Sequence, residues 1–157
     1  SHSTLIIDDS NHNVNGKAEI FEVISDKGVK GCKVDMGPTL SPFVTSATRT
    51  FTLDPENTVL EINDVLTVEK GTDHILKWNL ITRANPRIES DNSIILTKKG
   101  HKMRLEVVSG QKVTPMAESA NSENVYDMPN YGVSRVGFIF DLPAGETCDI
   151  KVKLTTL

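Results

Sequence analysis

Alternation of apolar and polar residues with a period of two constrains this chain more than any other feature. The segments KMRLEVV and DIKVKLTTL place apolar side chains on one face and charged side chains on the other. The segment VGFIFDL repeats the pattern. This period is that of a β-strand with one buried face, and no segment carries the i, i+3, i+4, i+7 stripe of an amphipathic helix. The pattern predicts a core that includes Leu60, Ile62, Met103, Leu105, Val107, Phe138, Phe140, Ile150 and Val152.

Turn-forming sequences separate these strands at intervals of about 8 to 12 residues. They include SDKG, LDPENT, EKGTD, TKKG and LPAGE. Many short strands with regular turns are typical of an all-β fold, so we expect an antiparallel β-sandwich of roughly ten or more strands. The 157 residues carry no internal linker or repeat, which predicts a single β-sandwich domain over residues 1–157.

Composition excludes several classes of partner. The chain has 17 basic and 21 acidic residues, a net charge of -4, and therefore lacks the excess of Lys and Arg that nucleic-acid binding requires. No apolar run approaches the roughly 20 residues of a membrane-spanning helix. Cys32 and Cys148 each alternate with apolar neighbours, and we expect two buried free thiols rather than a disulfide framework.

Motifs of catalysis are missing from the sequence, and we assign no catalytic residue. The segment DDSNHNVNG is rich in oxygen donors, but Val14 and Ile20 stand where a calcium loop needs glycine and glutamate, so a turn is expected. Three aromatic side chains, those of Trp78, Tyr126 and Tyr131, are candidates for stacking on a sugar. For Trp78 the alternative is a place in the core, since a lone tryptophan in a strand is usually buried.

Arg49 shares its predicted strand face with Phe51, where an unpaired charge would be very unfavourable. The turn LDPEN is short enough to make the flanking strands antiparallel neighbours. Counting outward from this turn places Arg49 opposite Asp64 rather than Glu61. The sequence therefore predicts a partly buried, bidentate ion pair between Arg49 and Asp64. The alternative is a twisted edge strand from which Arg49 reaches solvent.

Three segments carry a resemblance to a known family. HSTLIIDD, then ATRTFTLDPENTVLEINDVL, then KWNLITRANPRIESDNSIILTKKGHKMRLEV together resemble the C-terminal β-sheet region of heparinase II/III-like polysaccharide lyases. The resemblance covers nearly the whole chain, and HSTLIIDD is its strongest part. It implies that residues 1–157 form the C-terminal fragment of a longer lyase, with an α/α toroid domain upstream.

The resemblance implies a parent enzyme that cleaves uronate-containing, acidic polysaccharides by β-elimination. It places the catalytic groups upstream of Ser1, so this chain would be non-catalytic, supporting the fold and one wall of the substrate cleft. His2 matches a histidine that helps to bind zinc in relatives, with its partner ligands also upstream. No cofactor is expected in this chain itself, and a periplasmic or secreted bacterial protein is implied.

Two other functions stay open at the level of the sequence. One is a free-standing carbohydrate-binding module, and the other is a purely structural β-sandwich. The length of the native gene product separates both from the lyase interpretation, since only a lyase requires hundreds of helical residues before Ser1.

Overall fold

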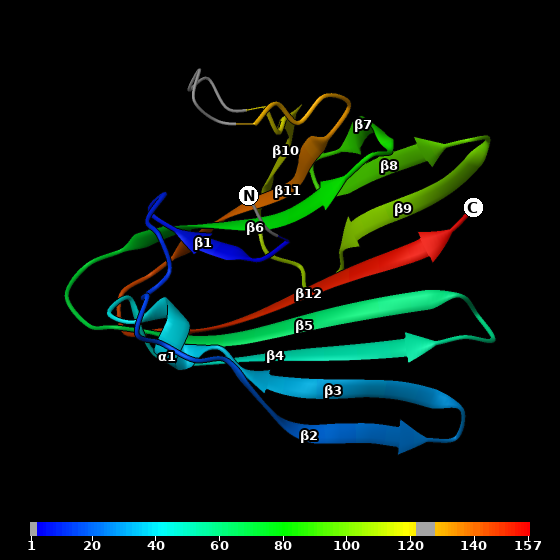
Figure 1. Cartoon of the computed structure of the whole chain (residues 1–157). Helices are drawn as coiled ribbons and strands as arrows, with labels where there is room; N and C mark the ends of the chain where they lie inside the picture. Colours follow the sequence, from blue (N-terminus) through cyan, green and yellow to red (C-terminus); the bar gives the residue numbers. More distant parts are fainter. Residues whose placement is uncertain (1–2, 122–127) are drawn as a thin grey trace.

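The computed structural model describes residues 3–121 and 128–157 and consists of two antiparallel β-sheets packed face to face (Figure 1). The smaller sheet has four strands in the order β1-β6-β11-β10. Their bounds are Leu5–Ile7 for β1, His74–Thr82 for β6, Ser134–Leu142 for β11 and Thr114–Ser119 for β10. The predicted all-β sandwich is confirmed.

The larger sheet has eight strands in the order β2-β3-β4-β5-β12-β9-β8-β7. These strands are Glu19–Asp26 (β2), Val29–Asp35 (β3), Val44–Asp54 (β4), Val59–Val68 (β5), Thr147–Thr156 (β12), His101–Val107 (β9), Ser93–Lys98 (β8) and Asn85–Ser90 (β7). One short helix, α1 (Gly37–Leu40), is found in the part of the chain that the structure describes. No helix among the described residues has the length and apolar character needed to cross a membrane.

The core lies between the two sheets, where the apolar face of each strand meets the other sheet. The predicted core positions that are buried are Ile62, Leu105, Val107, Phe138, Phe140, Ile150 and Val152. Leu60 and Met103 are partly buried and pack against the rim of this core. The period of two therefore identified the inward face of these strands correctly.

The two cysteines correct one expectation from the sequence. Cys32 and Cys148 are free thiols, as expected, but both are only partly buried. Cys148 packs against the core, and this burial raises the pKa of its thiol above the ordinary value. Cys32 lies on β3, near the edge of the larger sheet, where fewer side chains cover it.

Candidate functional site

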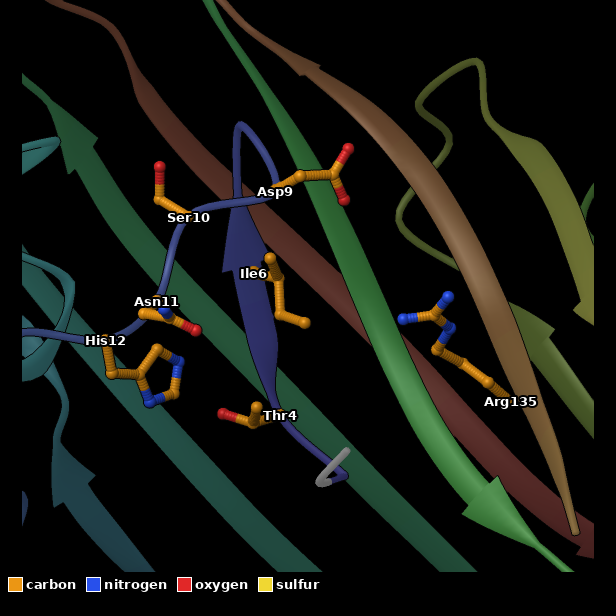
Figure 2. Close-up of a pocket in the computed structure, with 7 residues that line it drawn as sticks. All are labelled: Thr4, Ile6, Asp9, Ser10, Asn11, His12 and Arg135. Atoms are coloured by element: carbon orange, nitrogen blue, oxygen red, sulfur yellow. The ribbon is translucent and has the colours of Figure 1, made fainter. Parts of the chain in front are cut away.

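A hollow of about 480 Å³ lies beside β1 on the outer face of the four-stranded sheet. Figure 2 shows that β1 and the loop after it provide most of its lining, while the Arg135 side chain extends from β11 toward β6. Ile6 alternates with the buried Leu5 and Ile7, which establishes that the hollow opens away from the core. The lining residues are Thr4, Ile6, Asp9, Ser10, Asn11, His12 and Arg135.

A tight turn after β1 shapes one side of the hollow and confirms the turn expected at DDSN. The Ser10 backbone N–H donates to the Ile7 carbonyl at 2.9 Å. Asp8 and Asp9 have φ values of 50° and 55°, the left-handed conformation of both central residues in a type I′ turn. Neither is glycine, so the turn is held against its local preference by other contacts.

Both aspartates of the turn bind to β6 and provide those contacts. An Asp8 carboxylate oxygen accepts the Ile75 backbone N–H at 2.9 Å, and the other lies 2.6 Å from His74 Nδ1. Asp9 accepts a hydrogen bond from Lys77 Nζ. The backbone hydrogen bond from Ile75 is the main reason that the pKa of Asp8 lies below its ordinary value, and the interaction with His74 lowers it further.

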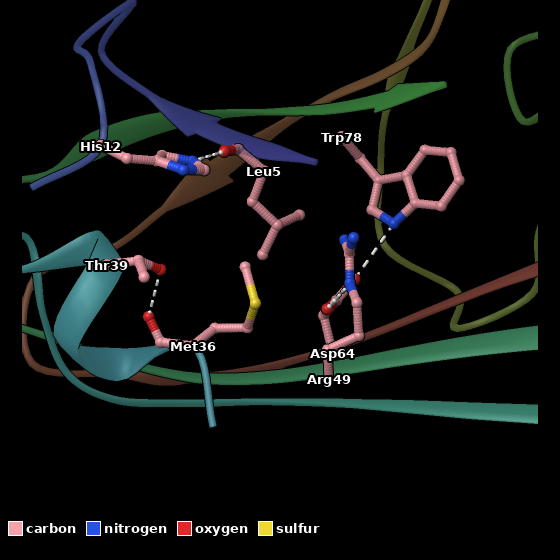
Figure 3. A network of polar contacts seen from close by, with 7 residues as sticks. All are labelled: Leu5, His12, Met36, Thr39, Arg49, Asp64 and Trp78. Atoms are coloured by element: carbon pink, nitrogen blue, oxygen red, sulfur yellow. Dashed lines mark hydrogen bonds and ion pairs between the residues drawn. The ribbon is translucent and has the colours of Figure 1, made fainter. Parts of the chain in front are cut away.

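His12 covers the free edge of β1, which pairs with β6 on its other side. Its Nε2 lies 2.7 Å from the Leu5 carbonyl oxygen (Figure 3). A carbonyl oxygen only accepts, so Nε2 is the donor in this contact. This contact fixes the His12 ring at the rim of the hollow.

The cations around the hollow already have carboxylate partners. Arg135 contacts Glu118 through Nε at 2.7 Å and through Nη2 at 2.6 Å, while Lys77 binds Asp9. These groups are partly exposed, and exposed ion pairs are worth only about 0–1 kcal/mol, so a ligand can exchange with them at small cost. The hollow thus offers hydroxyl, amide, imidazole and guanidinium groups to a polar ligand rather than a bare basic surface.

Asn79 is a residue of this sheet face that the sequence analysis missed. It pairs with Gly137 on β11, and its backbone N–H donates to the Thr4 carbonyl, so it lies between Thr4 and Gly137 in the sheet. It is 2% exposed, and neither its side-chain nitrogen nor its oxygen has a hydrogen-bond partner within the described structure. A buried amide without partners is uncommon, and no sequence pattern marks it.

The predicted ion pair between Arg49 and Asp64 is present between the sheets. The two residues are register partners on β4 and β5. Arg49 Nε donates to Asp64 Oδ1 at 2.6 Å, and Nη2 donates to Oδ2 at 2.9 Å, which is the bidentate arrangement. Arg49 is 5% exposed and Asp64 is 1% exposed, so the pair is fully buried rather than partly buried.

Trp78 joins this pair from the opposite sheet and corrects the proposed sugar contact. Its Nε1 donates to Asp64 Oδ2 at 3.0 Å, and the Arg49 guanidinium carbon lies 5.8 Å from its ring centroid (Figure 3). At 1% exposure its ring cannot stack on a sugar from solvent. The alternative, a core tryptophan, is correct because Trp78 shares its strand face with the buried Leu76.

The other predicted site residues have different outcomes. Tyr131 is 77% exposed in the loop before β11. Tyr126 and His2 lie outside the described residues. Within the described ranges, no group of three or more His, Cys, Asp or Glu side chains is placed to hold a metal ion.

A smaller hollow of about 270 Å³ borders His74 at the start of β6. His74 and Phe43 form a T-shaped aromatic contact with ring centroids 5.3 Å apart, and His74 Nδ1 lies 2.6 Å from an Asp8 carboxylate oxygen. Asp73 and Asp141 also line this hollow. Through Nδ1, His74 thus forms a hydrogen bond with the carboxylate of Asp8.

Comparison with known proteins gives a likeness at the level of fold. No protein-family profile matches the chain, and no curated protein matches it. Among solved structures, heparan sulfate lyase HepC from Pedobacter heparinus superposes with a TM-score of 0.76 at 16% identity, over 99% of this chain. A heparinase III superposes with a TM-score of 0.72 at 10% identity, again over 99% of this chain.

The chain has the fold of a domain of heparan sulfate lyases. It spans only 24% of the length of HepC and 23% of that of the heparinase III. The likeness to heparinase-type lyases inferred from HSTLIIDD and the strands after it is therefore confirmed as a likeness of fold.

Proposed function

We propose that this chain is a non-catalytic β-sandwich domain of a heparinase II/III-like polysaccharide lyase. The observation that carries the proposal is the superposition of 99% of the chain on a quarter of a heparan sulfate lyase. In this proposal the sandwich supports the fold, and the hollow beside β1 forms part of one wall of the substrate cleft.

The chemistry of the hollow is suited to a glycan. Thr4, Ser10 and Asn11 offer the neutral donors and acceptors that sugar hydroxyls use. Arg135 can pair with a uronate carboxylate bidentately if it exchanges Glu118 for the ligand. The hollow would therefore bind an acidic sugar through one guanidinium and several neutral groups.

Elimination at a uronate needs a base that removes the proton next to the carboxyl group, an acid for the leaving oxygen and neutralisation of the carboxylate. The described residues do not assemble these groups around the hollow. His74 and Asp8 form a His–carboxylate pair, but the His74 side chain is only 12% exposed and packs against Phe43. We propose that the acid and base belong to an α/α toroid upstream, together with any zinc that His2 helps to bind.

The secreted or periplasmic location remains part of the proposal, because acidic polysaccharides are extracellular substrates. A free-standing carbohydrate-binding module is the second candidate. It is favoured by one observation: the hollow is built by this chain alone, so it does not need another domain to exist.

The test is a comparison of the full-length gene product with the 157-residue chain. Each is incubated with heparan sulfate, chondroitin or alginate while the absorbance of the unsaturated uronate product is followed. We expect turnover by the full-length product and none by the isolated chain. Turnover by the isolated chain, or glycan binding by a full-length product that has no lyase activity, would contradict the proposal.

A further inference from the structure

The eight-stranded sheet extends beyond the four-stranded sheet on one side. Figure 1 shows β2 and β3 at the far edge of the larger sheet, away from the four strands of the smaller one. The inward face of these two strands continues the face that buries the core. At the opposite end of the large sheet the edge strand β7 is also mostly exposed, but the first four residues of its neighbour β8 are buried, whereas the neighbour of β2, β3, is only partly buried.

Exposure rises steadily along the register from the core to the edge. In one row Asp64 and Arg49 are 1% and 5% exposed, Val34 is partly buried, and Ile20 at the edge is 64% exposed. Cross-strand partners project from the same face of a sheet, so these side chains form one continuous row. The smaller sheet covers the row at Asp64 and Arg49 but does not cover it at Ile20.

The neighbouring row shows the same gradient with apolar side chains throughout. Ile62 is 7% exposed, Phe51 and Cys32 are partly buried, and Val23 at the edge is 79% exposed. Phe21, at the irregularity between these rows, is 58% exposed. Apolar side chains that continue a core outward into solvent mark a surface that another element covers.

The other face of the same strands carries an ion pair and threonines, although it also includes Ile24, which is partly buried. Glu22 pairs with Lys33, their side-chain atoms 2.8 Å apart, and Lys33 is followed by Thr50 along the register. The two faces of β2 and β3 therefore differ in chemistry although both are exposed.

We propose that the β2–β3 apolar face, defined by Ile20, Val23, Cys32, Val34 and Phe51, docks against an apolar surface of another domain of the same polypeptide. The proposal rests on the proposed function, since the similar lyase chains are about four times as long as this chain. The face continues the core without a break, which suits a fixed contact within one chain.

A second copy of this chain fits the edge less well. Antiparallel pairing of two whole β2 strands would place Glu19 of each opposite Asp26 of the other. Like charges directly opposite one another destabilise a strand pair. An interdomain contact avoids this because it uses the apolar face rather than the strand edge.

Cys32 provides a direct probe, because its thiol lies in this face. We would label the full-length gene product and the 157-residue chain with a maleimide and quantify modification by peptide mass spectrometry. The docked face predicts that Cys32 reacts at least about tenfold more slowly in the full-length product, as for any segment protected by packing. Cys148 belongs to the sandwich core and should react equally in both, which makes it the internal control.

A pair of matched variants tests whether the apolar face itself is responsible. In the full-length product Val23→Lys should restore Cys32 labelling to nearly the rate of the isolated chain. Glu22→Gln, at the preceding residue, which is exposed on the opposite face, should leave the protection unchanged. Hydrogen exchange of the β3 amides in both proteins gives a second measurement that does not depend on thiol chemistry.

Equal Cys32 labelling and equal exchange in the two proteins would overturn the inference. So would a stable dimer of the 157-residue chain that Val23→Lys dissociates in sedimentation, because the occupant would then be a second copy. Lyase activity is measured separately. An active full-length product with an unprotected Cys32 refutes the docking alone, whereas an inactive one with a protected Cys32 refutes the proposed function alone.

Discussion

Trp78 on the smaller sheet donates its indole N–H to the carboxylate of Asp64 on the larger sheet at 3.0 Å. With the two hydrogen bonds from Arg49, this carboxylate accepts three hydrogen bonds in the middle of the core. The interaction joins the sheets by a directional bond, whereas the apolar packing around it has little directional preference. It therefore fixes how the two sheets lie over one another.

Removal of the Asp64 carboxylate should strongly destabilise the fold. Asp64→Ala leaves the Arg49 guanidinium buried without a partner, and the expected cost is about 3–5 kcal/mol in chemical denaturation. Arg49→Met combined with Asp64→Leu removes both charges and should cost far less. A near-zero effect of Asp64→Ala would mean that Arg49 reaches solvent.

Trp78→Phe tests the link between the sheets. The variant loses one hydrogen bond to a charged group and part of a buried ring, so we expect a loss of about 2–4 kcal/mol. In the Arg49→Met, Asp64→Leu background, Trp78→Phe should cost less unfolding free energy, because that background has no carboxylate that could lose a hydrogen-bond donor. Equal losses of unfolding free energy in both backgrounds would mean that Trp78 stabilises the fold by packing alone.

Asp8 should make the free energy of unfolding depend on pH in the acidic range. Its folded pKa lies below its ordinary value, so its contribution is complete above the unfolded pKa of about 4 and is lost as pH falls through the folded pKa. The difference in unfolding free energy between wild type and Asp8→Asn should be constant at neutral pH and shrink below about pH 4. The pKa of Asp54 is also lowered, but Asp54 is present in both proteins and cancels in the comparison. A difference that grows in acid would contradict this assignment.

Gly137→Ala should prevent normal pairing of β11 with β6. A Cβ at this position would lie 1.8 Å from the Trp78 carbonyl oxygen, so the backbone of one strand must move. We expect a loss of at least about 3 kcal/mol, measured by thermal unfolding. Gly110→Ala is the control, since its Cβ would meet nothing within 4 Å and only the positive φ opposes it, at about 1–2 kcal/mol.

Arg135→Gln tests the hollow as a glycan contact. In the full-length product it should raise the KM for a uronate polysaccharide roughly tenfold with a smaller change in kcat, because one charge-assisted contact is lost. Arg104→Gln is the matched control, since Arg104 pairs with Glu89 on the larger sheet, 3.2 Å apart. If the two variants behave alike, the hollow does not contact the substrate.

The sequence predicted the strands and their inward faces because a half-buried strand has a period of two. It also predicted the partner of Arg49. When a short turn joins two antiparallel strands, counting residues outward from the turn gives their register. It could not divide the strands between two sheets, since alternation marks which face is buried and not which strands pair across long separations. Trp78 shows the same limit: burial of a lone tryptophan in a strand is the usual case, but its hydrogen bond to Asp64 on the opposite sheet is not visible in local sequence.

Strand β12, the last of the fold, lies between β5 and β9 in the interior of the larger sheet. Until residues 147–156 have left the ribosome, that sheet can exist only as two separate pieces, β2 to β5 and β7 to β9. Both pieces expose an edge during that time, and both depend on one late segment to close. A polypeptide that stops before residue 147 therefore leaves both pieces with an unpaired edge, and it should be degraded rather than fold as a slightly shortened domain.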